Sequence, residues 1–100
     1  MTVTTHKDAD GVVIALEGEL NTLAAPAFEE AVTRELENTT HLVVDMEKLT
    51  YITSAGLRIL LMAQQGMDDK EGTLVIRHVN AEVSEVFNVT GFSGILTVEA

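Results

Sequence analysis

The sequence predicts an α/β domain in which helices pack on a mixed, mostly parallel sheet. After an N-terminal β-hairpin, apolar runs of strand length alternate with helical segments, giving the order β-β-α-β-α-β-α-β. Such alternation favours parallel strands joined by right-handed crossovers. Hydrophobic residues make up 46% of the 100 residues, enough for one modest core, and no repeat or linker divides the chain. We therefore expect a single domain over residues 1–100.

The first part of the chain is expected to hold a hairpin followed by a helix. Residues 3–7 and 12–17 read as two strands around Asp8-Ala9-Asp10-Gly11, a turn whose residues tolerate positive φ. Residues 23–38 repeat apolar side chains at three- and four-residue spacing, which is typical of a helix. Pro26 suits the first turn of that helix and would break an interior turn.

The rest of the chain continues the alternation of strands and helices. Residues 41–45 contain a continuous apolar run, which indicates a strand that is covered on both faces or is central in the sheet. A helix is expected over residues 54–69, a strand over 73–77, a shorter helix over 81–89 and a last strand over 95–98.

The charge of the chain excludes several classes of partner. Lys and Arg total 6 against 16 Asp and Glu, which gives a net charge of −10 with histidine neutral. Nucleic acid is not expected, because phosphates must be neutralised by cationic side chains, and an anionic membrane surface is disfavoured for the same reason. A basic protein surface is the natural electrostatic complement.

Composition also predicts the compartment. There is no cysteine, which excludes disulfides and thiolate chemistry and fits a reducing cytoplasm. Residues 1–8 lack the apolar core of a signal peptide, and the longest apolar stretch, residues 59–63, is too short to span a bilayer. We expect a cytoplasmic protein with no membrane contact that is a monomer when free.

Catalytic, cofactor and metal motifs are missing from the sequence. It contains no glycine-rich phosphate loop, no G-x-G-x-x-G and no H-E-x-x-H. His6, His41 and His78 are isolated and read as strand-edge residues without ligand spacing. The stretch around Ser54 is not a G-x-S-x-G elbow, because residue 52 is isoleucine. We expect no enzyme, no cofactor and no metal.

Ser54, at the start of the expected helix 54–69, is the main candidate functional residue. Backbone N–H groups at a helix start lack partners inside the helix, so a hydroxyl there either caps the helix or faces a partner and can accept a phosphate. The reciprocal capping box is missing, because Leu57 stands three residues later. The small residues Ala55 and Gly56 would leave room for a second protein to approach the hydroxyl.

A helical wheel at about 100° per residue predicts which side of this helix faces the sheet. The expected core side carries Gly56, Ile59, Leu60, Ala63 and Met67. Ser54 and Arg58 fall on the outer side, and the wheel places Leu57 and Leu61 beside them. Two exposed leucines next to an exposed serine would form a small apolar patch of the kind that marks a protein contact.

The chain resembles STAS domains of the bacterial anti-sigma factor antagonist type. The resemblance covers residues 12–21 with the ending Leu16-Glu17-Gly18-Glu19-Leu20-Asn21, the strand to Asp45, the signature Ile52-Thr53-Ser54-Ala55-Gly56-Leu57, and residues 87–96. In that family the signature commonly reads Asp-Ser-Ser/Thr-Gly-Leu. Thr53 replaces the aspartate and Ala55 the second hydroxyl residue, while Asn21 stands where the family often has aspartate.

The resemblance implies a STAS fold and a partner switch. The unmodified domain would bind an anti-sigma factor that is itself a serine kinase of the GHKL type, and so release a sigma factor. That kinase would phosphorylate Ser54 and end the interaction, and a PP2C-type phosphatase would restore it. By position, the implied partner-binding residues are Asn21, Thr22, Thr53, Ser54, Ala55, Gly56, Leu57, Arg58 and Leu61.

Two other functions remain open from the sequence. A STAS accessory subunit of a lipid-transport ATPase would use the same helix without obligatory phosphorylation. A small hydrolase would use Ser54 as its nucleophile, although no histidine or lysine lies near it in sequence.

Overall fold

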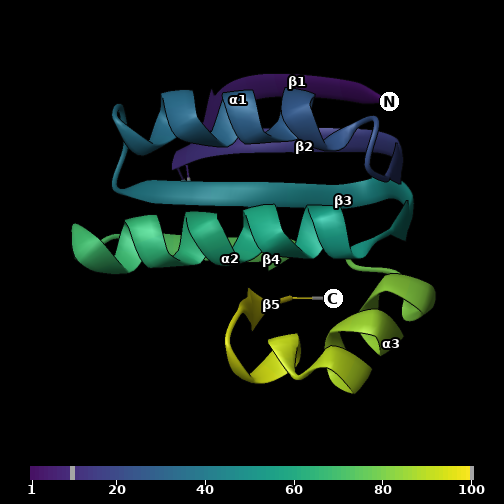
Figure 1. Ribbon diagram of the computed structural model, residues 1–100. Helices are drawn as coiled ribbons and strands as arrows, with labels where there is room; N and C mark the ends of the chain where they lie inside the picture. The colour runs from purple at the N-terminus through teal and green to yellow at the C-terminus, as the bar shows by residue number, and fades with distance from the viewer. Residues whose placement is uncertain (10, 100) are drawn as a thin grey trace.

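The computed structural model describes residues 1–9 and 11–99, so Asp10 of the predicted turn lies outside the described residues. The elements follow the predicted order, with one short 3₁₀ helix before the last strand (Figure 1). The strands are β1 (Thr2–Asp8), β2 (Gly11–Leu20), β3 (His41–Ile52), β4 (Thr73–Arg77) and β5 (Thr97–Val98). The helices are α1 (Ala25–Leu36), α2 (Ser54–Asp69), α3 (Ala81–Thr90) and the 3₁₀ helix η1 (Phe92–Gly94).

The five strands form one mixed sheet whose spatial order, β1-β2-β3-β4-β5, is the order along the chain. β1 and β2 pair antiparallel, which confirms the predicted hairpin, and the other three pairings are parallel. A helix lies in each parallel connection, and α1 and α2 run side by side along one face of the sheet (Figure 1). Within residues 1–9 and 11–99, every helix is too short or too polar to cross a membrane.

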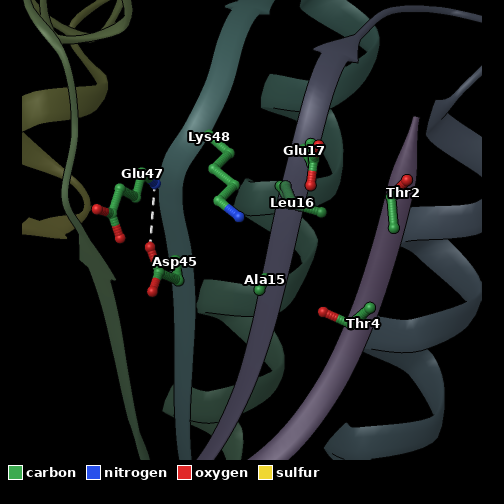
Figure 2. Close-up of a pocket in the computed structure, with 8 residues that line it drawn as sticks. All are labelled: Thr2, Thr4, Ala15, Leu16, Glu17, Asp45, Glu47 and Lys48. Carbon is green, nitrogen blue, oxygen red and sulfur yellow. Dashed lines mark hydrogen bonds between the residues drawn. The ribbon is translucent and has the colours of Figure 1, made fainter.

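One hydrophobic core joins the helices to a single face of the sheet. Alternate residues of the two central strands enter it, such as Ile14 of β2 and Val44 of β3, and so do Phe28, Leu60 and Phe87 from the three helices. Figure 2 views the opposite face, with the helices behind the strands. Because strand side chains alternate between faces, the helix-free face carries the intervening residues.

The predicted strand over residues 41–45 is covered on both faces, as expected. Leu42 and Val44 enter the helix-side core, and Val43, on the opposite face, is only 4% exposed. The strand is longer than predicted, however, and runs to Ile52. Beyond Asp45 it pairs only with β2, so its last residues extend past β4. Register shifts in the β2–β3 pairing interrupt the simple alternation there, which hid this half of the strand from the sequence pattern.

Ion pairs connect three strands across the helix-free face. The guanidinium of Arg77 in β4 lies 3.3 Å from an Asp8 oxygen in β1 and 3.6 Å from an Asp45 oxygen in β3. His78 adopts φ 60, a left-handed conformation, and its Nδ1 lies 3.0 Å from the other oxygen of Asp45. His78 directly follows β4, as predicted for a residue beside a strand, but it is not isolated in space, because β4 pairs with β3 and brings it onto Asp45.

The surroundings of Asp45 lower the pKa of its carboxyl group. Partial burial raises the pKa of this carboxyl, but the hydrogen bond from the Glu47 N–H and the nearby His78 and Arg77 together outweigh it. The pKa of Asp45 therefore lies below its ordinary value of 3.8.

We expect Asp45→Asn to destabilise the protein near neutral pH and to weaken its response to acid. A folded-state pKa below the unfolded value means that ionised Asp45 stabilises the fold above pH 3.8, and this contribution is lost as the pH falls through the lower folded value. Urea unfolding measures the free energy of unfolding of both proteins at about pH 7 and about pH 3. The difference between wild type and variant should be smaller at the lower pH. Asp69→Asn, at an exposed helix end, is the matched control and should show no such narrowing.

Candidate functional site

The end of β3 is fixed to the end of β2 by the residue before Ser54. Thr53 directs both its backbone N–H, at 3.0 Å, and its side-chain hydroxyl, at 3.2 Å, to the carbonyl oxygen of Leu20. Leu20 and Ile52 are neighbours in the parallel register. The start of α2 is therefore set by the ends of the two central strands.

Ser54 is the first residue of α2, and the N-cap position belongs to Thr53. Thr53 makes no side-chain capping bond, and its hydroxyl donates instead to the Leu20 carbonyl. In contrast, Asn80 caps α3 by accepting a 2.8 Å hydrogen bond from the Val83 N–H. Ser54 is exposed, and its hydroxyl makes no hydrogen bond to any of the described residues. Of the two interpretations left open by the sequence, a helix cap and a presented hydroxyl, the geometry favours the second.

Gly56 serves packing, which corrects its assignment to the partner-facing surface. It is buried, and a Cβ built on it would lie 2.7 Å from the Leu20 side chain and 2.9 Å from that of Ile52. The absent side chain lets α2 approach the strand ends closely. Ala55 is half-buried and also packs against the core. Gly56 therefore brings the helix to the sheet, and the room that it leaves is filled by the Leu20 and Ile52 side chains.

The prediction that Leu57 is exposed is wrong. Its side chain is 7% exposed and belongs to the hydrophobic core. The wheel assumed that α2 buries only the side that carries Ile59, Leu60 and Ala63, but the buried sector is wider and reaches Leu57. Helix α1 lies alongside α2 on the same face of the sheet (Figure 1) and meets the other flank of α2, where a Cβ on Gly66 would lie 2.9 Å from the Leu36 side chain. Leu61 is half-buried, and Arg58 is exposed. The outer surface near the start of α2 consequently consists of Ser54, Arg58 and part of Leu61.

The connection from β2 to α1 begins directly after Leu20, whose carbonyl oxygen accepts the two hydrogen bonds from Thr53. Asn21 is half-buried, and its Oδ1 accepts a 3.0 Å hydrogen bond from the Ala24 N–H, which shapes the turn before α1. Thr22 is exposed, and Leu23 is 92% exposed. The apolar spacing predicts a helix that includes Leu23, but Leu23 lies before the helix. The position of Pro26 in the first turn was the signal that the helix begins later, at Ala25.

Tyr51 is a second exposed apolar residue that the sequence did not single out, with 51% exposure. It pairs in register with Glu19, one residue before the paired Leu20 and Ile52. Its position on the helix-free side could not be read from the alternation, because a register shift precedes it.

A group of possible metal ligands lies elsewhere, on the helix-free face. One oxygen or nitrogen from each of Asp45, Glu47 and His78 lies within 4.8 Å of the others. Asp45 and Glu47 also line a hollow of about 150 Å³, together with Thr2, Thr4, Ala15, Leu16, Glu17 and Lys48 (Figure 2). Arg77 already supplies a positive charge to Asp45. Ile52 lies seven positions after Asp45, roughly 20 Å along β3, so this group does not contribute to the Ser54 surface.

Comparisons with known proteins identify the family of this chain. The model of a family described as "Mlab, STAS domain" matches residues 3–97. BtrV of Bordetella bronchiseptica, named as an anti-sigma factor antagonist, is 34% identical over 91 residues, covering 89% of this chain and 78% of its own.

Solved structures give the same fold. An anti-sigma factor antagonist from Mycobacterium paratuberculosis superposes with a TM-score of 0.88 at 20% identity, over 98% of this chain and 84% of its own. The Bacillus protein SpoIIAA in its phosphorylated form gives 0.77 at 18% identity, over 99% and 92%. Its unphosphorylated form also gives 0.77, at 17% identity, over 99% and 87%.

We expect Gly56→Ala to lower the free energy of unfolding by about 1–2 kcal/mol. Overpacking against Leu20 and Ile52 costs about 1–3 kcal/mol, which exceeds the gain of at most about 1 kcal/mol from replacing a helical glycine. Urea unfolding measures the change. Gly94→Ala is the control, since no atom lies within 4 Å of its added Cβ. An unchanged or higher stability of Gly56→Ala would mean that α2 does not need this close approach.

Proposed function

The chain belongs to the STAS domain family, and from this premise we propose that it is an anti-sigma factor antagonist controlled by phosphorylation of Ser54. In the unmodified state it binds an anti-sigma factor that is itself a GHKL-type serine kinase, and a sigma factor is released. Phosphorylation of Ser54 ends this binding, and a PP2C-type phosphatase restores it. The observation that carries the proposal is the exposed Ser54 hydroxyl, without an internal hydrogen bond, at the first position of α2.

Ser54 is the accessible phosphate acceptor in its signature. Thr53 is half-buried and commits its hydroxyl to the Leu20 carbonyl, while residue 55 is alanine. In the transfer, the Ser54 oxygen bonds to the γ-phosphorus of ATP, the bond from that phosphorus to ADP breaks, and the serine proton leaves to a base. Within the part of the chain that the structure describes, no base is hydrogen-bonded to Ser54, so the kinase supplies it.

The start of α2 can carry a phosphate without refolding. A phosphoserine adds about −1.5 to −2 charges, and a helix N-terminus favours anions. The first turn of α2 contains no acidic residue to repel the group. Solved forms of SpoIIAA with and without phosphate match this fold equally well, at a TM-score of 0.77 each, which supports a switch that leaves the fold intact.

Loss of binding then follows from charge and bulk on the contact surface. A phosphate between the partner and α2 must be desolvated, and a penalty of about 3 kcal/mol weakens binding more than a hundredfold. The net charge of −10 favours a partner with a basic face. A hydrolase is disfavoured, because a nucleophilic serine needs an adjacent base and Ser54 has none among residues 1–9 and 11–99.

We expect the GHKL-type kinase of the same organism to add one phosphate to the wild-type protein and none to Ser54→Ala. Intact-mass spectrometry after incubation with ATP measures this. Ser93→Ala removes another exposed serine and should be phosphorylated like wild type. A phosphate that persists on Ser54→Ala would place the acceptor elsewhere.

We also expect Ser54→Asp to weaken kinase binding by at least tenfold, while Ser54→Ala keeps most of the affinity, because only the former adds charge to the contact surface. Titration calorimetry with the purified kinase and without ATP measures both. Equal affinities would contradict a charge-based switch. Co-purification with a membrane ATPase, together with no kinase binding, would favour the role of a transporter accessory subunit.

A further inference from the structure

We propose that Arg58 receives the phosphate on Ser54, so that phosphorylation both adds charge to the contact surface and withdraws an arginine from it. The inference rests on the proposed function, since it concerns the phosphorylated state of the same serine. It assigns Arg58 a positioning role within the switch: the guanidinium pairs with the phosphate across one turn of α2.

The helix places the two residues for this contact. Ser54 and Arg58 are four residues apart in α2 and are both exposed. Residues at this spacing have Cβ atoms about 5–6 Å apart on one face of a helix. Helical side chains lean toward the N-terminus, so the long Arg58 side chain leans toward the turn that begins with Ser54. A guanidinium can then offer two parallel N–H donors to phosphate oxygens.

Arg58 is also uncommitted in the unmodified protein. It forms no ion pair or side-chain hydrogen bond with any residue in 1–9 and 11–99, although the chain has 16 acidic residues. Three of the five other cations are engaged: Arg34 pairs with Glu35, Arg77 with two aspartates, and Lys70 donates to the Leu36 carbonyl. The cation nearest to Ser54 along α2 is thus available.

The neighbours of Arg58 on the helix leave Ser54 as its natural partner. The positions three and four residues away are Ser54, Ala55, Leu61 and Met62. None of these is acidic, and Ser54 alone is polar. A phosphate on Ser54 would therefore be the first anion within one turn of Arg58, and no competing carboxylate on that face of α2 would have to be displaced.

The pairing gives the switch two effects from one modification. Before phosphorylation, Arg58 is free to donate to carboxylates or carbonyls of the partner surface. After phosphorylation, the same donors are directed to the phosphate and are lost to the partner. A kinase variant that tolerated the added charge would still lose the contacts made by Arg58.

The test places phosphoserine at position 54 during translation by an expanded genetic code, so that no kinase is required. Phosphorus NMR then follows the second phosphate ionisation, which lies near pH 6 in an unpaired phosphoserine. We expect this pKa to be about 0.3–0.5 units higher in Arg58→Gln than in the wild-type background, a two- to threefold change in proton affinity. Arg58→Lys should retain part of the lowering. Arg34→Gln, which removes an exposed arginine of α1, is the matched control and should have no effect.

The outcomes separate the inference from the proposed function. Equal phosphate pKa values in wild type and Arg58→Gln would overturn the pairing, even if a kinase modifies Ser54 as proposed. A lowered value that depends on Arg58 would support the pairing, even if no kinase were found to act on Ser54. The charge of Arg58 is exposed, so its replacement is expected to leave the fold intact, and circular dichroism of each variant checks this.

Discussion

The carbonyl oxygen of Leu20 is the point on which the functional surface depends. It accepts two hydrogen bonds from Thr53, one from the backbone and one from the hydroxyl, and so fixes the end of β2 to the end of β3. The chain enters α2 directly after Thr53 and turns toward α1 directly after Leu20. One acceptor therefore sets where two helices begin. It also fixes the direction of the Thr53 hydroxyl, which donates to Leu20 and makes no capping bond to α2.

Much of the fold could be predicted because its signals are local. Alternating apolar runs and helical spacing specify the order of elements, and the turn residues specify the hairpin. The full length of β3 could not be predicted, since pairing with β2 continues through two register shifts while β4 ends opposite Asp45. The contact between His78 and Asp45 was equally hidden. It depends on the parallel register of two strands more than thirty residues apart, which no local pattern reveals.

At the candidate site, the position of Ser54 could be predicted from the sequence, but the burial of its neighbours Gly56 and Leu57 could not. Ser54 follows from its place at a strand-to-helix junction, because the junction itself is a local feature. Leu57 and Gly56 could not be assigned correctly, because a helical wheel describes one helix against one surface. Here the core reaches further round α2 than the wheel allows and includes Leu57, and the side chains of Leu20 and Ile52 pack against Gly56. Residues that contact two neighbours at once are where single-element patterns fail.

The arrangement also confines the effect of a charge change at Ser54 to its own surface. The ion pairs that connect β1, β3 and β4 lie on the helix-free face, and roughly 20 Å of strand separates them from the start of α2. Interactions between exposed charges are screened beyond about 8–10 Å at physiological ionic strength. A phosphate on Ser54 therefore cannot act through that network. The side chains beneath α2 are packed into one core with α1 and the sheet. In the proposed switch, control of binding at this helix therefore arises on the contact surface itself, from charge, bulk and the donors that remain free there.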